Sequence, residues 1–217
     1  MKVAVLGTGT VGTTIATKLV SLGHEVTMGS RTADNEDATA WVSDAGGGAG
    51  QGTFADAAAA GELIVNCTAG AASLDALRAA GEQNLAGKVL IDVANALTFE
   101  TGRLTLTVCN TDSLGEQIQR AYPEARVVKT LNTMGNEVMV HPEQIPGRHC
   151  VFMSGDDAEA KQLVAGMLES FGWPPDSIVD LGGIETARGT EMYLVLWMEM
   201  MQATGDRRLN INVVRPD

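Results

Sequence analysis

The feature that most constrains the fold is a glycine-rich turn between a buried strand and a helix near the start of the chain. The apolar run KVAVLG (2–7) reads as a strand that is covered on both faces. Gly7, Gly9 and Gly12 follow in a GxGxxG spacing, and apolar residues then recur at helical intervals over 10–23. A strand, a tight turn and a helix in this order predict the first unit of an alternating β/α fold.

The rest of the chain repeats this alternation of apolar runs and helical patterns. We therefore predict an α/β fold, a doubly wound and mostly parallel sheet of the Rossmann type, with a short C-terminal helical extension. The glycine-rich stretch 44–53 is expected to be a flexible connection. The further strands are expected at 24–29, 62–67, 88–93, 125–130, 149–155 and 177–181.

The glycines and their neighbours fit the pyrophosphate of a dinucleotide. Gly7 permits the tight turn, Gly9 lets the backbone approach the phosphates, and Gly12 allows the helix to lie close to the strand. The helix N-terminus offers N–H groups and a partial positive charge, and nearby threonines add hydroxyl donors. The alternative is that these glycines only make a turn. The cofactor-binding candidates in this segment are Gly7, Thr8, Gly9, Thr10, Val11 and Gly12.

The end of the second expected strand indicates which dinucleotide binds. NAD-binding domains have an acidic residue about 20 residues after the glycines, and here that place falls at Gly29 and Ser30. A carboxylate would repel a 2′-phosphate, whereas the guanidinium of Arg31 can bind it bidentately, with hydroxyls of Ser30 and Thr32 beside it. We therefore predict NADP. The alternative is that Arg31 is a solvated charge and that Thr32 or Asp34 caps the next helix.

Charge and cysteine usage limit the partners. The formal net charge of −12 repels nucleic acid and anionic membrane surfaces. No apolar run is long enough for a membrane-spanning helix and no secretory leader is recognisable, so we expect a cytoplasmic protein. Cys67, Cys109 and Cys150 are scattered and form no CxxC pair, which predicts neither a disulfide framework nor a metal site.

Five motifs spread along the chain carry a family resemblance. They are VAVLGTGTVG (3–12), GSRT (29–32), VVKTLNTM (127–134), GDDAEAK (155–161) and LGGIETARGTEMY (181–193). In these motifs the chain resembles the NADPH-dependent reductases of the deazaflavin coenzyme F-420, whose relatives include pyrroline-carboxylate reductases and the cytosolic domains of membrane metalloreductases. The resemblance implies reversible hydride transfer between NADPH and a flavin-like ring.

The segments that follow the expected strands at 62–67, 88–93 and 125–130 should line one pocket, because ligands of doubly wound sheets lie beyond the strand C-termini. Small side chains over 68–73 would let a cofactor approach the backbone. We add Thr68, Ala69, Ala71 and Asn95 to the cofactor-binding candidates.

Asn95, Asn132 and Thr133 are the candidates for positioning the reacting rings, because amides and hydroxyls can hold a carboxamide or a ring carbonyl. The alternative is that each asparagine satisfies the backbone of a local turn. Hydride transfer needs no acid or base at its centre, and no nucleophile stands beside an obvious base, so no residue is assigned as an acid–base catalyst. Archaeal members have His and Pro where this chain has residues 132–135. Because this segment would face the ring of the electron acceptor, the identity of the acceptor stays open.

The C-terminal segment is expected to pack on the nucleotide fold and not to form a second helical domain. We predict an NADP-binding domain over 1–155 and an extension over 156–217 that contributes to a dimer interface and the acceptor site. EMYLVLWMEMM (191–201) is apolar on nearly every helical face, which predicts a homodimer, unless the helix is wholly buried within one chain.

Three functions remain open. The first is an NADPH:F-420 oxidoreductase, the second an NADPH-dependent reductase of a flavin, a ferric chelate or a small imine, and the third a protein that senses NADP(H) without turnover. The first requires a cationic groove for the acidic tail of F-420. The available cations are Arg103, Lys129, Arg148, Arg188, Arg207 and Arg208.

Overall fold

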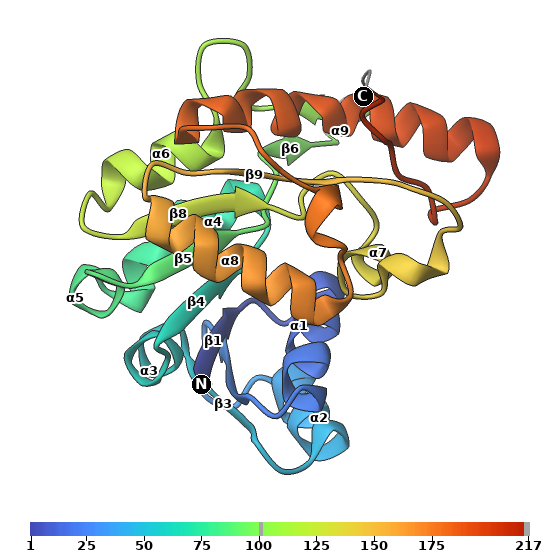
Figure 1. The fold of residues 1–217 in the computed structure, drawn as a ribbon. Coiled ribbons are helices and arrows are strands. Elements are labelled where there is room, and N and C mark those ends of the chain that lie inside the picture. The colour runs from blue at the N-terminus through green and yellow to red at the C-terminus, as the bar shows by residue number, and fades with distance from the viewer. Residues whose placement is uncertain (100–101, 215–217) are drawn as a thin grey trace.

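An eight-stranded sheet forms the centre of the computed structural model, which describes residues 1–99 and 102–214 (Figure 1). The strand order is β10-β9-β8-β5-β4-β1-β2-β3. Neighbouring strands are parallel except β8 and β9, which pair antiparallel with Lys129 opposite Ser154. The predicted α/β class and the mostly parallel sheet are confirmed. The strands are β1 (Lys2–Leu6), β2 (Glu25–Ser30), β3 (Ala49–Thr53), β4 (Leu63–Asn66), β5 (Val89–Asp92), β8 (Arg126–Thr130), β9 (Val151–Ser154) and β10 (Ile178–Asp180).

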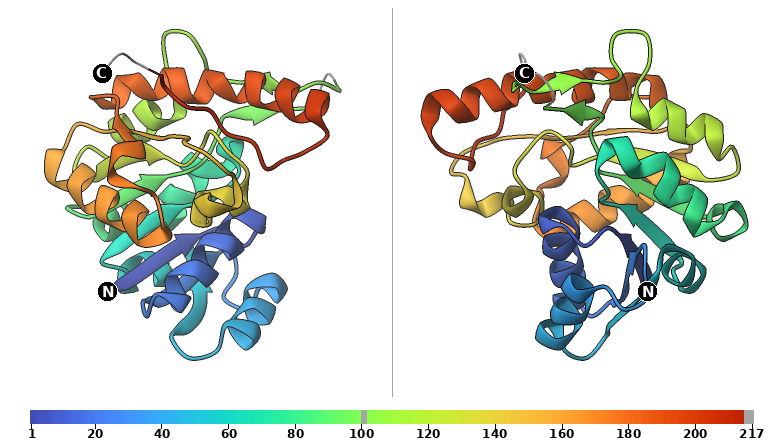
Figure 2. Two further views of the ribbon diagram at one scale, coloured as in Figure 1. Left: turned by 45° about the vertical axis from the view of Figure 1, so that its right-hand side comes forward. Right: turned by 180° about the vertical axis from the view of Figure 1, so that it is seen from behind.

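Helices cover both faces of this sheet, because alternate residues of each strand point to opposite sides. Val3 and Val5 of β1 join the core on one side, and Ala4 and Leu6 join the core on the other. α8 covers the face seen in Figure 1, and α4 and α6 cover the opposite face in Figure 2. The first face carries α1 (Thr10–Ser21), α2 (Glu36–Ala45), α7 (Asn136–Val140) and α8 (Ala158–Phe171). The second carries α3 (Phe54–Ala60), α4 (Gly70–Ala80), α5 (Glu82–Leu85) and α6 (Leu114–Ala121).

Two elements were not expected from the sequence. The stretch 44–53 is not wholly a flexible connection, because Ala49–Thr53 forms the edge strand β3 and pairs in register with β2. The sequence AGQGT has little intrinsic strand preference, so the neighbouring strand decides its conformation. A small hairpin of β6 (Leu97–Thr98) and β7 (Thr105–Leu106) follows β5.

The C-terminal segment adds to the same sheet through β10 and then forms α9 (Ala187–Thr204), which runs across the top of the molecule in Figure 1. The chain then turns back, and the Cys150 N–H donates to the carbonyl of Ile211 at 2.8 Å. Three short 3₁₀ helices complete the described elements, at Pro142–Gln144, Pro175–Ser177 and Ile184–Thr186. Within the described residues, no helix is long and apolar enough to cross a membrane.

Candidate functional site

The glycine turn joins β1 to α1 at the carboxyl edge of the sheet. Gly7 has a φ of +115°, and a Cβ there would lie 2.8 Å from the Cys67 carbonyl oxygen. A Cβ on Gly12 would lie 2.1 Å from the Gly7 carbonyl oxygen. A Cβ on Gly9 would meet nothing within 4 Å. Two of the glycines therefore allow close packing within the chain, whereas the third leaves the outer side of the turn open.

The N-terminus of α1 is available to an anion. Gly9 is the N-cap and supplies no side-chain acceptor, and the first turn contains no acidic residue. Thr8 is half-buried and Thr10 is exposed. The Thr13 hydroxyl, in contrast, is engaged, because it donates to the Gly9 carbonyl at 3.1 Å. The donors left for a phosphate are the first backbone N–H groups of α1 and the hydroxyls of Thr8 and Thr10.

The end of β2 shows a division of roles that the sequence did not reveal. Ser30 is buried, its hydroxyl donates to the Thr32 carbonyl, and the Thr32 N–H bonds back to it at 3.3 Å. Ser30 therefore shapes the turn, as serine hydroxyls often do. The Arg31 guanidinium is exposed and forms no ion pair with the residues that the structure describes. The alternative that Thr32 or Asp34 caps the next helix is wrong, because Asn35 is the N-cap of α2.

A cleft of about 350 Å³ lies beside the glycine turn, beyond the ends of β4, β5 and β8. It includes the predicted residues Thr68, Ala69, Asn95 and Asn132. Ala71 lies exposed in the first turn of α4 and is not among the lining residues. The full lining is Gly9, Thr10, Val11, Cys67, Thr68, Ala69, Gly70, Val93, Ala94, Asn95, Leu97, Asn132, Met134, Met139 and Leu194.

Asn95 and Asn132 bind each other across this cleft wall. The Asn95 Nδ2 donates to the Asn132 carbonyl at 2.9 Å, and the Asn132 Nδ2 donates to the Asn95 Oδ1 at 3.0 Å. Leu131, the residue directly before Asn132, has a φ of +63°. A branched residue in the left-handed region is strained, and such strain is often found at functional sites. The asparagines thus join the ends of β5 and β8, and neither only satisfies its own turn.

Thr133 and Gly70 also contribute to this region, one through its hydroxyl and the other through its lack of a side chain. Thr133 is buried, and its hydroxyl oxygen has no hydrogen-bond partner among the described residues. Buried polar atoms without a partner are rare in proteins and call for an explanation such as a ligand. A Cβ on Gly70 would lie 2.0 Å from the Asn95 carbonyl oxygen. Only glycine therefore allows α4 to begin against the segment that carries Asn95.

A buried polar network underlies the cleft. The Lys129 Nζ lies 2.7 Å from Asp92 Oδ2 and 2.8 Å from Glu191 Oε1, and all three side chains are at most 2% exposed. The same ammonium donates to the Ala94 carbonyl. Asp92 also accepts from the Asn66 Nδ2 at 2.8 Å. Burial by itself would lower the pKa of Lys129, but the carboxylates of Asp92 and Glu191 raise it above its usual value, so the lysine is charged at neutral pH.

The sequence did not reveal this network, although a signal was present. Lys129 and Asp92 lie inside runs that were predicted to be covered on both faces, where a charged side chain cannot reach water and must have a buried partner. Lys129 had instead been counted among the cations of an open groove, which is wrong because its side chain is fully buried.

Most of the other candidate cations are also engaged. Each of three arginines has a carboxylate partner: Arg148 with Asp176, Arg188 with Glu116, and Arg208 with Asp206. Arg103 also has an interaction partner. Arg207 is exposed and forms no ion pair within the described residues. Of the cations that were expected to form a groove for an acidic tail, Arg207 is therefore the one left without an ion-pair partner among the described residues.

Two side chains that could in principle act as a nucleophile or a base, Cys67 and His149, are held in structural roles. Burial, followed by the charge of Asp92, raises the pKa of the Cys67 thiol far above its usual range, so this cleft residue stays a thiol. His149 is buried between the Pro142 carbonyl and the Asn210 Nδ2, both at 3.0 Å. The cleft therefore offers alignment and hydrogen bonds, without an evident acid–base pair.

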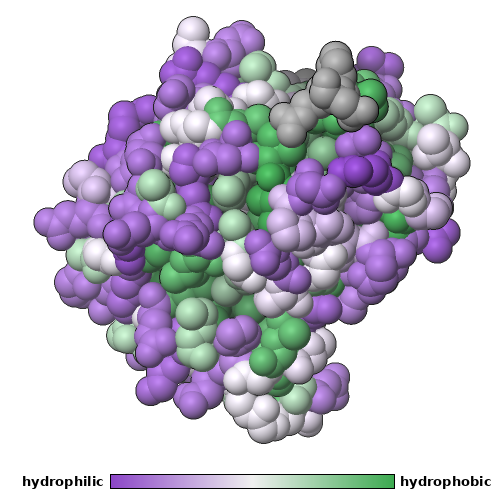
Figure 3. Space-filling view, viewed as in Figure 1, coloured by the Kyte–Doolittle hydropathy of each residue, from purple (hydrophilic) through white to green (hydrophobic). Residues whose placement is uncertain are grey.

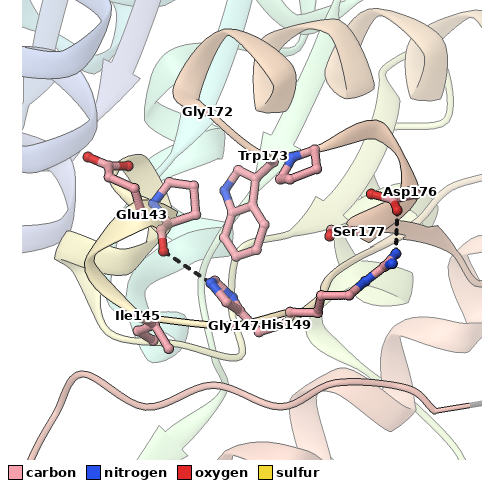
Figure 4. Close-up of a pocket in the computed structure, with 11 residues that line it drawn as sticks. Glu143, Ile145, Gly147, His149, Gly172, Trp173, Asp176 and Ser177 are labelled. Atoms are coloured by element: carbon pink, nitrogen blue, oxygen red, sulfur yellow. Dashed lines mark hydrogen bonds and ion pairs between the residues drawn. The ribbon is translucent and has the colours of Figure 1, made fainter.

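A second hollow lies away from this cleft, next to the C-terminal end of α8 (Figure 4). Its polar groups bind one another: His149 contacts the Pro142 carbonyl and Arg148 pairs with Asp176, as the dashed lines show. The Trp173 Nε1 donates to the Met139 carbonyl at 2.9 Å. With these donors already used, this hollow is a weaker ligand site than the cleft.

The sheet order, the glycine turn and the cleft at the carboxyl edge define the class of Rossmann-type dinucleotide-binding folds. A family model described as NADP oxidoreductase, coenzyme F-420-dependent, matches residues 2–96. A solved structure from Arthrobacter sp. FB24, assigned as an F-420-dependent NADP-reductase, is 50% identical in sequence and has a TM-score of 0.93. The alignment covers 99% of this chain and 100% of that one. The chain belongs to the family of coenzyme F-420-dependent NADP oxidoreductases. The prediction of an NADP-dependent oxidoreductase is thereby confirmed.

Two more distant relatives extend the comparison. Metalloreductase STEAP3 of Rattus norvegicus is 30% identical over 191 residues, which are 88% of this chain and 36% of that protein. The chain thus spans little more than a third of the length of that curated relative. A reductive aminase of Aspergillus terreus, in complex with NADPH and ethyl levulinate, has a TM-score of 0.66 and is 21% identical over 94% of this chain and 62% of its own. This last likeness shows the shared fold.

Proposed function

We propose that the protein transfers a hydride reversibly between NADP(H) and the deazaflavin coenzyme F-420. The observation that carries this proposal is the cleft that extends from Gly9 and Thr10 to Asn95, Asn132 and Leu194. Its volume of about 350 Å³ is within the usual range of small-molecule sites. One end of the cleft has the features of a phosphate site, and the other has amides suited to a planar ring.

The residues at the glycine turn fit an NADP pyrophosphate. The open side of Gly9 and the uncapped N-terminus of α1 leave room and donors for an anion. Arg31 would bind the 2′-phosphate, with Thr32 beside it, while Ser30 holds the turn. We propose the following cofactor-binding residues: Gly7, Thr8, Gly9, Thr10, Val11, Gly12, Arg31, Thr32, Thr68, Ala69 and Asn95. Of the other two predicted residues, Ser30 would act through the turn that it holds, and Ala71 lies outside the lining of the cleft.

At the other end, Asn95, Asn132 and Thr133 would position the reacting rings. Each asparagine amide uses one N–H in the mutual pair and keeps a second one. The unpartnered hydroxyl of Thr133 supplies a further polar atom. When bound, NADPH would supply the hydride and F-420 would accept it together with a proton from solvent. The chain itself aligns and shields, which suits a site without an acid–base pair.

We also propose how the parts of the chain divide this work. Residues 1–155 would hold NADP(H), and 156–217 would complete the acceptor side through Leu194 of α9. The exposed apolar residues Met192, Val195 and Leu196 of α9 would form a homodimer interface in a cytoplasmic protein. Figure 3 shows apolar surface in the upper part of the molecule, where α9 lies. Trp197 is buried within the chain, so Leu196→Glu is the variant that tests the dimer, by light scattering.

The test of the proposed reaction mixes the purified protein with NADPH and oxidised F-420 and follows the deazaflavin absorbance. We expect it to bleach, with one NADPH consumed per F-420, without added metal or flavin. Ala69→Leu should slow turnover about tenfold by filling the cleft. Ala72→Leu, in the first turn of the helix that Ala69 precedes as N-cap but outside the lining, is the matched control and should turn over normally.

A second function is favoured by the metalloreductase relative and by the asparagine, threonine and methionine that follow β8. On this alternative the acceptor is a flavin, a ferric chelate or a small imine. Reduction of one of these with F-420 left untouched would replace the first proposal. Tight NADPH binding with no acceptor reduced would instead indicate a sensor of NADP(H).

A further inference from the structure

The Lys129 ammonium lies directly beneath the segment that carries Asn95. It binds Asp92 and Glu191 as an ion triad and donates to the carbonyl of Ala94, the residue before Asn95. The Asp92 Oδ1 accepts from the Ala94 N–H at 3.3 Å. Both backbone groups of Ala94 are therefore held by the triad, which limits where Asn95 can lie.

Asp92 also connects the triad to a second lining residue of the cleft. Its Oδ1 also accepts from the Asn66 Nδ2 at 2.8 Å, and the Asn66 Oδ1 accepts from the Thr68 hydroxyl at 2.7 Å. Thr68, like Asn95, lines the cleft. The carboxyl ends of β4 and β5 are thus connected to the same ammonium.

Glu191 connects the triad to two helices. Its carboxylate accepts from the backbone N–H groups of Leu114 at 2.8 Å and Gly115 at 3.0 Å, at the start of α6. Glu191 itself belongs to α9, and Leu194, one turn further along, lines the cleft. The position of α9 is therefore tied to that of Ala94 through one buried carboxylate and one buried ammonium.

Three charges buried together are costly to desolvate, and such clusters contribute little net stability relative to apolar residues of the same size. They do impose strict geometry, because each charge left without its partner is strongly unfavourable. Sites that require exact alignment need this kind of support behind the residues that touch the ligand.

We propose that Glu191, Lys129 and Asp92 are positioning residues for hydride transfer, through which α9 sets the place of Ala94 and Asn95 and thereby the spacing of the two reacting rings. This inference rests on the proposed function. It assigns no contact between the triad and a ligand, and it predicts that the triad governs turnover more than cofactor affinity.

Glu116 supplies a matched control. Glu116 belongs to the first turn of α6, where the Glu191 carboxylate binds. Like Glu191, it connects α6 with α9, because it pairs with Arg188 of α9. Its carboxylate, however, accepts from the hydroxyl of the N-cap residue Ser113, and among the described residues it forms no ion pair or hydrogen bond with Lys129. Glu116→Gln and Glu191→Gln therefore remove one negative charge each from the same pair of helices, and only the second weakens the triad.

The experiment compares these two variants in the full chain. For Glu191→Gln we expect kcat for acceptor reduction to fall about ten- to a hundredfold, as a small misplacement of reacting groups can cause. The Kd for NADPH should stay within about threefold, since the glycine turn and Arg31 are untouched. Amide hydrogen exchange at residues 93–95 should accelerate about tenfold. Glu116→Gln should leave all three close to those of the natural protein.

Wild-type kcat in Glu191→Gln, or equal losses in both variants, would overturn the proposal, whatever the exchange shows. If the natural protein reduces no acceptor, the proposed function fails, and hydrogen exchange alone then decides whether the triad holds the Asn95 segment. If Glu191→Gln does not fold, the uncharged combination Asp92→Asn, Lys129→Met, Glu191→Gln replaces it, because it leaves no buried charge unpaired. Normal kcat in that folded variant would also overturn the proposal.

Discussion

The glycine turn and the Lys129 triad lie at the same edge of the sheet, yet they treat polar groups in opposite ways. At the turn, the N-terminus of α1 is uncapped and Arg31 is exposed without an ion-pair partner in the described residues. At the triad, Lys129, Asp92 and Glu191 are buried and each binds groups of the protein. The first region has free donors that can bind a ligand, whereas the second has used its donors and can only support.

Mutations in the two regions should therefore have different effects. Changes at the turn should alter affinity for the cofactor with modest effects on folding, except where two backbone segments touch. Changes at the triad should alter the folded state itself, or the alignment that depends on it.

The largest expected effect is on stability at the triad. Lys129→Met leaves Asp92 and Glu191 buried without their cation, so the free energy of unfolding should fall by about 3–5 kcal/mol. Urea unfolding followed by circular dichroism measures it. Lys161→Met is the control, because Lys161 pairs with a half-exposed Asp180, and it should cost about 1 kcal/mol or less. Equal losses for the two lysines would contradict the view of the triad as a buried support.

The second effect separates two glycines of one turn. Gly12→Ala places a Cβ 2.1 Å from the Gly7 carbonyl oxygen and should destabilise the protein by about 3 kcal/mol. Gly9→Ala meets no atom of the chain, so its unfolding midpoint should stay unchanged while the Kd for NADPH rises. Unfolding curves and NADPH fluorescence titrations give both values. Unchanged NADPH affinity in Gly9→Ala would show that the open side of the turn is not the cofactor side.

The third effect concerns the choice between NADPH and NADH. Arg31→Ala should weaken NADPH binding by about 1.5–3 kcal/mol, roughly tenfold or more, because a charged contact with the 2′-phosphate is lost. NADH binding should be unaltered, and stability should not change, since Arg31 is exposed. Arg78→Ala, another exposed arginine, controls for the loss of charge. Equal affinity of the natural protein for both cofactors, by titration, would remove the assignment of NADP to this strand end.

The smallest effect is a pH dependence at the start of α6. The hydrogen bond from Arg120 lowers the pKa of Asp112 to about 2. A lowered carboxyl pKa stabilises the folded state above the unfolded pKa near 4, and this contribution is lost as the pH falls from about 4 through the folded pKa of about 2. Asp112→Asn should therefore cost about 1 kcal/mol at pH 7, because the pair is partly solvated, and progressively less as the pH falls toward and below about 2. A cost that did not depend on pH would show that the charge of Asp112 is not what stabilises.

The sequence predicted the parts of the site that are local in the chain. Gly7 was expected to permit the tight turn and Gly12 the close approach of the helix. The positive φ of Gly7 and the Cβ position at Gly12 agree with this, because strand, turn and helix are consecutive there. Asn95 and Asn132 were placed at one cleft because parallel strands end at one edge. That the two asparagines bind each other depends on side-chain orientation, which no spacing rule gives.

The parts that were missed depend on neighbours distant in sequence. β3 exists because β2 supplies its hydrogen bonds, although AGQGT does not favour a strand. Glu191, a partner of Lys129, lies in a helix whose apolar pattern indicated a dimer interface or burial within the chain, but no ion pair. The Ser30 hydroxyl was expected to contact a ligand, but it bonds to the Thr32 carbonyl in its own turn. The sequence cannot decide between these two hydrogen bonds, because serine makes both kinds.

The place of Glu191 in the chain also bears on the order of assembly. α9 follows every strand of the sheet, so during synthesis all eight strands emerge before the carboxylate that completes the triad. Contacts between residues distant in sequence form late because they close long loops. Until α9 docks, Lys129 has one carboxylate instead of two, and the start of α6 lacks an acceptor for two of its N–H groups. We therefore expect acceptor reduction to return after the far-ultraviolet circular dichroism signal during refolding, because the alignment of the cleft is completed only when α9 docks.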